Sequence, residues 1–561
     1  MIRQPERLAI GRLLGWVAAL ATVIVVPWAS YDPINVPKLA VISAGGFMCL
    51  SFVLFNAKAL QTKEFRIPVI IVGVFIVDLL AVLFIAGNNF NQEFFGANGR
   101  ATGFVAYFAL TGLLLAAIIS STQFTLTRIS WFLIFTGLLS TLYGIMQSLG
   151  TDPFKWGGNL YSPVFGFLGN PDFQSSFIAF SAVMAVAMFF NNGIKKSIKV
   201  LLLVYLVAAV YVIKETKAQQ GFLVFLGGTG AIAIIYVFKS KWKMLTWPLI
   251  SAGFIGLVLA VVGSLNSGPL ASLLHKASVI YRGDYWRAGW KMTLQHPVFG
   301  VGLDSYGDWY RRSRTIAATV RRGPDTISNA AHNVWLDFSS NGGFPLLIIY
   351  LALMALVVRS AFKVIRRSSE FEPVFAGLFA VWIGYQAQSI ISLNQLGLAV
   401  WGWIISGLII GYEINGRNNL EAEKNTNKNR STQSVSSQKV QPATSVALFI
   451  GLLIGLLVGL PPMIASSKFK SALESGDKSV IANSANTFPR DASRTAQVAF
   501  ILQQNKFEDE ALSVVVPAVK NYPDSYDLWK ILSTLKNASP DQVTQAKAQM
   551  KRLDPHNPEL K

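Results

Sequence analysis

A hydrophilic stretch over about 265–343 combines arginine and histidine in a way that suits a phosphorylated ligand. Guanidinium groups match phosphate oxygens, and imidazole titrates near neutral pH, which suits a general base. The residue types therefore favour a site in which cations hold an anion while a histidine moves a proton. On charge alone, the alternative is a solvated loop or one that touches anionic lipid headgroups. The residues concerned are His275, His296, His332, Arg282, Arg287, Lys291, Arg311, Arg312, Arg314, Arg321 and Arg322.

The chain that must position this stretch has the composition of a membrane protein. Of its 561 residues, 52% are hydrophobic and 14% are charged, whereas soluble domains carry roughly 25% charged residues. Many apolar runs reach the roughly 20 residues that a bilayer-spanning helix needs. We predict an all-α polytopic membrane protein with about thirteen transmembrane helices, near 9–28, 37–55, 67–86, 102–120, 128–149, 173–190, 199–213, 221–238, 244–262, 344–358, 374–392, 396–412 and 444–464.

Positive charge in the short connections predicts the orientation of these spans. Because Lys and Arg concentrate on the cytoplasmic side, alternate connections should be cytoplasmic, and the charges fit an N-terminus on that side. Residues 265–343 then form a large extracytoplasmic loop, and an odd number of spans places the C-terminus outside as well. The same topogenic role accounts for much of the net charge of +20, so we predict no nucleic-acid partner. The connections are Lys58–Arg66, Lys195–Lys199, Lys239–Lys243 and Arg359–Arg367.

The sequence divides into four parts. Residues 1–412 read as the membrane domain and 444–464 as the last span. Between them, 413–443 is polar and reads as a disordered cytoplasmic linker. Residues 466–561 read as an extracytoplasmic helical tail.

The tail has the spacing of paired helices. Small residues let two helices pack closely and prolines end each pair, which resembles tetratricopeptide repeats; a generic helical hairpin is the alternative. Two repeats are few for independent stability, so we expect the tail to pack on the membrane domain or on a partner. The pattern comprises Ala499, Leu502, Ala511, Val515, Ala518, Pro523, Trp529, Leu532 and Pro555.

The order of residues in the large loop resembles one family. The loop opens with Arg282-Gly-Asp-Tyr-Trp-Arg287 and continues with His296-Pro-Val-Phe-Gly-Val-Gly302. It closes with Ala-His332-Asn and then Asn341-Gly-Gly343 before the next span. This order is similar to the periplasmic loop of the O-antigen ligase and Wzy-type polymerase superfamily, and the resemblance of the membrane part covers most of 1–412.

The resemblance implies a GT-C-like fold and a glycosyltransferase of GT-C type in the bacterial inner (cytoplasmic) membrane. Such an enzyme transfers a glycan from a polyprenyl-diphosphate carrier to an acceptor hydroxyl. His332 corresponds to the family's loop histidine and is the predicted catalytic base. Arg282 corresponds to the loop arginine and is predicted to hold the diphosphate, with Arg287 as a second candidate. Because arginines can neutralise the diphosphate, no metal or other cofactor is predicted.

Two further segments bear on the substrate site. The segment Gly169-Asn170-Pro171-Asp172 resembles another part of the family, so we take Asn170 and Asp172 as substrate-binding candidates. The family commonly has an arginine in a turn between two central spans, but this turn, Lys214–Gly221, contains none. Lys217 is the predicted replacement as a point charge, and a snorkelling interfacial lysine is the alternative.

Several functions remain open from the sequence. As an enzyme, the protein is a polymerase, a ligase or a protein O-oligosaccharyltransferase, with a lipid-linked donor and a glycan, lipid or protein acceptor as partners. A transporter of an anion or a carrier lipid is the alternative, because Asp78 lies within the third span, where carboxylates are costly. A structural partner for Asp78 is the other explanation. A scaffold that binds envelope-assembly proteins through the tail is a third possibility.

Overall fold

The computed structural model describes residues 3–156, 164–275, 277–425 and 440–560, and every regular element in these ranges is a helix. This confirms the all-α fold. A long helix coincides with each predicted span: α1 (Gln4–Val23), α2 (Asn35–Phe55), α3 (Arg66–Ile85), α5 (Phe104–Ser120), α6 (Gln123–Ser148), α7 (Pro171–Phe189), α8 (Lys196–Glu215), α9 (Gln219–Lys239), α10 (Thr246–Ser264), α15 (Val334–Arg367), α16 (Pro373–Ile391), α17 (Leu396–Asn425) and α18 (Pro442–Ser475).

Eleven of the described helices are long and apolar enough to cross a membrane. Of the other two predicted spans, α5 is apolar but has only 17 residues. Helix α1 has 20 residues and carries Glu6, Arg7 and Arg12 near its start. These charged residues make the N-terminal part of α1 polar, although ten residues of the helix are buried.

Helices α17 and α18 run well past their predicted ends, as does α15, which ends at Arg367. Helix α17 continues to Asn425. Past the apolar part of the helix, an ion pair of 2.9 Å joins Arg417 to Glu413 one turn before it. The first part of the predicted disordered linker 413–443 is therefore helical, and residues 426–439 lie outside the described residues. Helix α18 continues past 464 to Ser475 because Phe469, which is 1% exposed, packs in the core of the tail. Hydropathy marks where lipid contact ends, whereas a helix continues for as long as its residues find packing partners.

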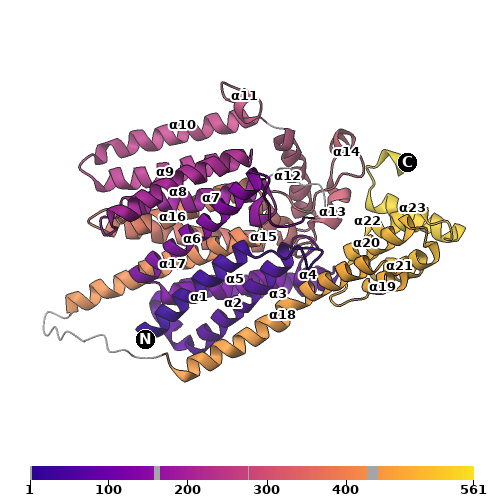
Figure 1. Cartoon of the computed structure of the whole chain (residues 1–561), viewed down its shortest axis with the longest axis horizontal. Coiled ribbons are helices and arrows are strands. Elements are labelled where there is room, and N and C mark those ends of the chain that lie inside the picture. The colour runs from indigo at the N-terminus through magenta and orange to yellow at the C-terminus, as the bar shows by residue number, and fades with distance from the viewer. Residues whose placement is uncertain (1–2, 157–163, 276, 426–439, 561) are drawn as a thin grey trace.

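The helices form one bundle with two different ends (Figure 1). The N-terminal end of α1 and the ends of α17 and α18 that flank residues 426–439 lie at the left in this view. We call this the linker end. The opposite end, which we call the loop end, carries the large loop and the tail. Helix α18 runs along the bundle and joins the two ends.

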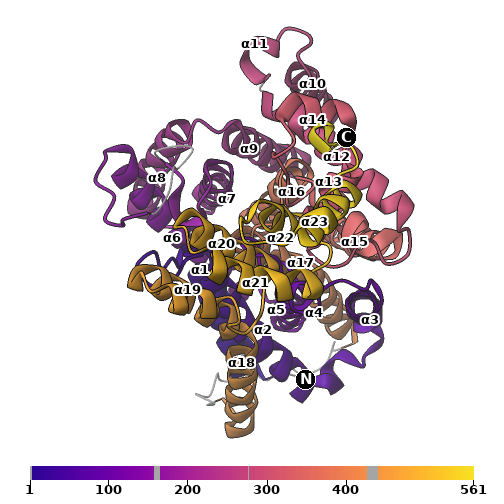
Figure 2. The same cartoon turned by 90° about the vertical axis from the view of Figure 1, so that its right-hand side faces the viewer.

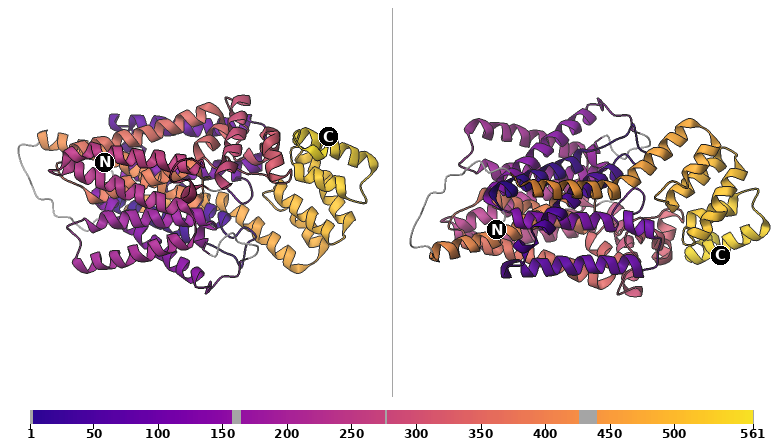
Figure 3. Two further views of the ribbon diagram at one scale, coloured as in Figure 1. Left: turned by 90° about the horizontal axis from the view of Figure 1, so that it is seen from above. Right: turned by 90° about the horizontal axis from the view of Figure 1, so that it is seen from below.

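Helix α18 docks on α2 through a row of glycines. Gly451, Gly455 and Gly459 recur every fourth residue, and a Cβ on any of them would lie within 3 Å of atoms of α2. Small residues at this spacing let two helices approach closely where lipid offers no hydrophobic driving force. The last span is therefore an integral part of the bundle, and it carries the tail to the loop end (Figure 3).

The large loop folds as four helices: α11 (Ala271–Leu274), α12 (Ala277–Gln295), α13 (Tyr306–Ser313) and α14 (Ile316–Arg322). A turn between α12 and α13 fixes the loop to α15. Gly343 breaks the helical path of α15 with a φ of 72°, and a Cβ there would lie 2.5 Å from the carbonyl of Val298. The side-chain oxygen of Asn341 accepts hydrogen bonds from the backbone N–H groups of Ser305 and Tyr306. The glycine-rich segment predicted at the start of this span is thus the part of α15 that contacts the turn between α12 and α13.

The tail consists of α19 (Lys478–Ser484), α20 (Ala492–Gln504), α21 (Glu508–Asn521), α22 (Tyr526–Thr534) and α23 (Pro540–Leu553). Helix α20 packs on α21 and α22 on α23, and the small residues Ala499 and Ala511 are buried between helices as the spacing predicted. The assignment to tetratricopeptide repeats stays a prediction. Figure 2 shows these helices lying across the loop end of the bundle.

Candidate active site

His332 lies at the loop end, directly before the first turn of α15. Its backbone has a φ of 53°, in the left-handed region that few residues other than glycine adopt. Two hydrogen bonds hold this conformation. Asn333 caps α15 by accepting from the N–H of Leu336 at 3.1 Å, and Asp337 accepts from the N–H of Ala331 at 2.8 Å. A strained backbone fixed from both sides is typical of a functional position.

The His332 ring stacks on an aromatic side chain of α12. Its centroid lies 5.2 Å from that of Tyr285, with an angle of 27° between the planes. Tyr285 is buried, and its carbonyl accepts from the hydroxyl of Tyr306 at 2.7 Å. The imidazole therefore has a fixed orientation on the wall formed by α12.

Three arginines act on the His332 imidazole. Burial, followed by the charges of Arg282, Arg100 and Arg322, lowers the pKa of His332 to about 3. At neutral pH the ring is uncharged, so one of its nitrogens is free to accept a proton. The three arginines come from different places: α12, the connection between α4 (Phe90–Phe95) and α5, and the last turn of α14.

The structure brings together Arg282 and the predicted residues at the start of α7. Arg282 Nη2 lies 3.3 Å from Oδ2 of Asp172. Asn170 is the N-cap of α7, and its side chain accepts from the N–H of Asp172 at 2.8 Å. The ion pair with Asp172 thus fixes the guanidinium of Arg282, and the Asn170 cap fixes the backbone of Asp172. Both candidates therefore help to position the arginine.

Arg287 lies apart from this group. It lies five positions after Arg282, which turns it by about 140° around the helix. Its side chain is 71% exposed and lies 3.9 Å from the buried carboxylate of Asp284, which also binds Arg321. Arg322, at the end of α14, contacts the hydroxyl of Tyr285 and lies over the ring of Tyr281, and the role of Arg287 in binding the diphosphate stays a prediction.

Lys217 lies in the turn between α8 and α9 and is exposed, with a φ of 57°. This turn is next to the first turn of α7, because Gly221 of α9 lies against Ser175 of α7. The side chain of Gln219 also donates to the carbonyl of Leu273 in α11. Lys217 therefore lies at the loop end, in the turn that packs beside the N-terminal part of α7.

The sequence analysis did not single out Arg100, which lies buried beside the site and pairs with two aspartates. Its side chain is 4% exposed, and its Nε lies 2.9 Å from Asp304. Its Nη2 lies 3.8 Å from Asp337, and its Nη1 donates to the carbonyl of Asn329 at 3.0 Å. We call Arg100, Asp304 and Asp337 the buried triad. The signal was present in the sequence, because Arg100 falls in a predicted extracytoplasmic connection, where Lys and Arg are rare.

Ion pairs with the tail hold the far side of the loop. Asp554 is fully buried and lies 2.6 Å from Arg314 and 3.4 Å from Arg311. Arg311 also lies over the ring of Tyr526. Arg311 and Arg314, which the sequence offered as ligand-binding cations, are therefore used to bind the tail, as the expected packing of the tail requires.

We expect Asp554→Asn to loosen the tail from the loop by roughly 3 kcal/mol or more, because it leaves the buried Arg314 without its counter-ion. Hydrogen–deuterium exchange should rise in α13, α14 and α23 and stay unchanged in α15. Asp325→Asn is the matched control, since the ion pair of Asp325 in the loop with Lys530 in the tail is solvent-exposed on both sides and such surface pairs contribute little. Equal exchange in both variants would contradict the role of Asp554.

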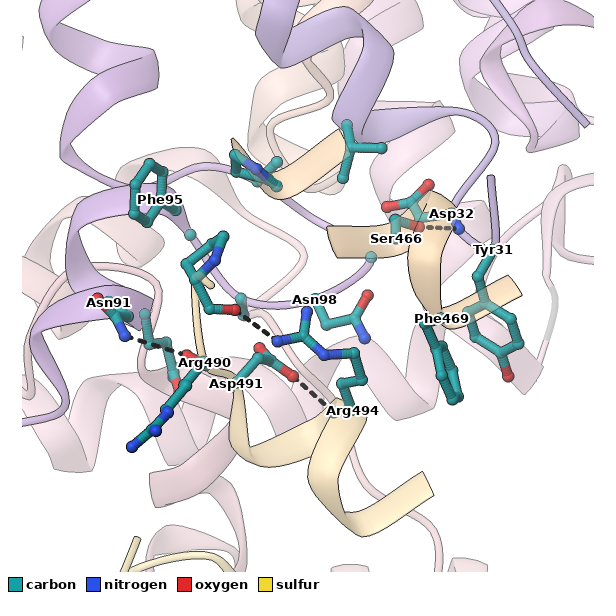
Figure 4. Close-up of a pocket in the computed structure, with 18 residues that line it drawn as sticks. Tyr31, Asp32, Asn91, Phe95, Asn98, Ser466, Phe469, Arg490, Asp491 and Arg494 are labelled. Carbon is teal, nitrogen blue, oxygen red and sulfur yellow. Dashed lines mark hydrogen bonds between the residues drawn. The ribbon is translucent and has the colours of Figure 1, made fainter. Parts of the chain in front are cut away.

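A separate pocket of about 60 Å³ lies at the seam between the tail and the membrane helices (Figure 4). Asp32, Asn91 and Phe95 line it from the bundle, and Arg490 and Arg494 line it from the tail. It contains none of the predicted site residues. The pocket is small and lies between the tail and the bundle, so we take it as part of their junction.

Comparison with known families points to the same region. Residues 201–351 match the family model described as O-antigen ligase. The matched range runs from α8 into α15 and contains Lys217, Arg282, Arg322 and His332. No curated protein matches the chain. Over this range, at the loop end of the helical bundle, the chain is similar to the O-antigen ligase family.

Proposed function

We propose that the protein transfers an oligosaccharide or polysaccharide from a polyprenyl-diphosphate carrier to an acceptor hydroxyl on the extracytoplasmic face of the bacterial inner membrane. The observation that carries this proposal is the neutral His332 held beside Arg282 and Arg322. Such a site offers a proton acceptor and fixed positive charge at one place, which is what transfer from a diphosphate requires.

In the proposed reaction, the acceptor oxygen bonds to C1 of the donor sugar while the bond from C1 to the diphosphate oxygen breaks. The acceptor proton passes to His332, and the bonding electron pair leaves with the diphosphate. Arg282 and Arg322 neutralise the charge that develops there, so the step is of the GT-C type and takes its positive charge from the protein.

Donor binding activates the base in this scheme. A histidine with a pKa of about 3 is a weak base, but the bound diphosphate offsets the charges of Arg282 and Arg322. The pKa of His332 then rises toward the working pH, where general-base catalysis is most efficient. The imidazole becomes a good proton acceptor when the donor is in place.

The proposed orientation follows from the charges at the two ends. Helices α9 and α15 end at Lys239 and Arg367 in the short connections of the linker end. The positive-inside rule then assigns that end to the cytoplasm. The N-terminus is then cytoplasmic, and the loop and the C-terminal tail are extracytoplasmic. The tail covers the loop end, where a glycan, lipid or protein acceptor would approach.

Purified protein with a labelled polyprenyl-diphosphate glycan and candidate acceptors tests the function directly. We expect acceptor-dependent release of the polyprenyl diphosphate together with a larger, labelled acceptor. Glycan, lipid and peptide acceptors in parallel separate polymerase, ligase and protein glycosyltransferase. Anion or lipid flux through proteoliposomes without any transfer would favour the transporter instead.

The pH dependence tests the electrostatics. Since the pKa of His332 is about 3, below its usual 6.5, protonation of the base should not limit kcat/KM between roughly pH 5 and 8. Arg322→Gln removes a cation that disfavours the imidazolium, so it should move the acid limb of the profile to higher pH. Arg287→Gln is the control and should leave the limb in place. A wild-type limb centred near pH 6.5 would contradict the lowered pKa.

A further inference from the structure

We propose that the pocket at the junction of the tail and the bundle binds one sugar unit of a glycan chain, away from the sugar that reacts. This inference rests on the proposed function and deepens it, because it adds a second place at which a glycan contacts the protein. The glycan is that of the lipid-linked donor or that of the acceptor, and transfer assays separate the two.

Four segments that are far apart in the sequence line this pocket (Figure 4). They are the connection between α1 and α2, the end of α4 with the turn after it, the loop-end part of α18 and the start of α20. The pocket reaches the surface, because Tyr31, Gly99 and Arg490 in its lining are exposed. Its volume of about 60 Å³ admits several hydroxyl-sized groups. This suits one edge of a sugar ring rather than an oligosaccharide.

Two buried side chains in this pocket have an atom without a hydrogen-bond partner among the described residues. Asp32 is 9% exposed; its Oδ1 accepts from the backbone N–H groups of Ile34 and Asn35, whereas its Oδ2 accepts none. Arg494 is 6% exposed; its Nη2 donates to two carbonyls of the tail, whereas its Nε donates to none. Both side chains line one cavity, so one small group can reach both. An unpaired acceptor and an unpaired donor indicate a ligand that donates and accepts.

The lining combines hydrogen-bonding groups with aromatic rings. The amide of Asn98 faces the pocket from the turn after α4 (Figure 4). The rings of Tyr31 and Phe469 lie 4.7 Å apart between centroids and belong to the same lining. Sugar hydroxyls donate and accept hydrogen bonds, and the C–H groups of a sugar ring pack on aromatic rings. A sugar therefore satisfies each kind of group in the pocket.

The charges in the lining balance, which argues against an anion or a metal ion. Asp32 and Asp491 stand against Arg490 and Arg494. A phosphate would meet two carboxylates, and a cation would meet two guanidinium groups. A prenyl chain would leave the buried polar atoms unpaired. A neutral polyhydroxyl ligand opposes none of these groups, and ordered water is the alternative that the experiment must separate from it.

The turn after α4 connects this pocket to the active site. The backbone N–H groups of Ala97 and Thr102 in this turn donate to Asp304 at 2.8 and 3.1 Å. The contacts continue through the buried triad to the N–H of Ala331, beside His332. Because protein fills this path, a sugar in the pocket is not the one attacked at C1. It is a unit further along the glycan, so its binding should act on KM rather than on kcat.

The test compares Asp32→Asn and Asn98→Ala with the wild-type protein in nanodiscs, on donors and acceptors that carry one sugar or the complete glycan. We expect each variant to raise KM for one complete substrate about 3- to 10-fold, as the loss of one hydrogen bond predicts. The kcat should stay within about twofold, and KM for the one-sugar counterpart should not change. A rise in donor KM assigns the pocket to the donor glycan, and a rise in acceptor KM assigns it to the acceptor. An unchanged KM for both complete substrates would overturn the proposal and leave ordered water as the occupant.

Folding is controlled by the choice of variants. Asparagine at position 32 keeps an oxygen that accepts from Ile34 and Asn35, so the melting temperature should stay close to that of the wild type. Asp325→Asn is the matched control, since Asp325 pairs with Lys530 of the tail at the same junction but outside the pocket, and no KM should change. If both pocket variants raise KM equally for one-sugar and complete substrates, their role is structural and the proposal is wrong.

Direct binding distinguishes failure of the pocket from failure of the proposed function. The probes are the free oligosaccharides released from the natural donor and acceptor, titrated calorimetrically into the full-length protein. We expect Asp32→Asn to weaken binding of one of them about 3- to 10-fold. If the wild-type protein transfers glycan and the variants match it in KM and in binding, only the pocket is wrong. If it transfers nothing but binds an oligosaccharide in an Asp32-dependent way, the transfer reaction is wrong and the pocket stands.

Discussion

Replacing His332 with asparagine is expected to lower the rate of glycan transfer about 10²- to 10⁴-fold, the usual contribution of a general base. Asparagine is the informative substitution because it tolerates the left-handed φ of 53° that His332 adopts. It keeps the turn before α15 and cannot accept the proton. The measurement is kcat of the reconstituted enzyme with saturating donor.

Binding and folding serve as controls for this result. The KM for the donor should stay close to that of the wild type, because Arg282 and Arg322 remain in place. His296→Asn is the matched control: His296 packs against Trp309 at 4.6 Å between ring centroids and lies before Pro297, away from the three arginines. A rate for His332→Asn within tenfold of the wild type would remove the base assignment.

Replacing Arg100 with methionine is expected to destabilise the loop end by about 3–5 kcal/mol. The change leaves Asp304 and Asp337 buried without their shared counter-ion. We also expect it to abolish the proposed transfer, because Asp337 accepts from the backbone N–H of Ala331 next to His332. Hydrogen–deuterium exchange should rise over residues 97–102 and 300–332, and the melting temperature should fall.

The matched control for Arg100 is Arg287→Met. Arg287 is largely exposed and pairs with Asp284 at 3.9 Å, so its loss should cost less than about 1 kcal/mol. Combining Arg100→Met with Asp304→Asn and Asp337→Asn should recover part of the stability, since no unpaired charge then remains. If Arg100→Met is as stable as Arg287→Met, the buried triad does not organise the site.

Much of the fold could be predicted from sequence because lipid contact is a local property of a segment. Each apolar run of about 20 residues becomes a helix whatever its neighbours do, since its backbone must be satisfied internally. The same argument placed the large loop between α10 and α15. It did not predict where α17 and α18 end, because their last turns depend on packing and ion pairs rather than on hydropathy.

The candidate site could be predicted only in part. The motif singled out His332 and Arg282, and the structure brings these two residues together. It also brings Asn170 and Asp172 to them, as the N-cap of α7 and the counter-ion of Arg282. Residue type alone could not separate Arg282 from Arg287, because both are arginines on one helix and only the helical phase distinguishes them.

The sequence by itself determined that this protein is a helical membrane protein with a cationic, histidine-bearing loop. Hydropathy and residue order are local properties of the sequence, so they can be recognised without knowing which segments contact each other. The tertiary structure alone decided which cations reach His332 and which bind the tail. Arg100 lies more than 200 residues before His332, and Asp554 more than 200 after it. Both residues form buried ion pairs with partners far away in the sequence. A buried charge needs a partner, and only the tertiary structure shows which residue supplies it.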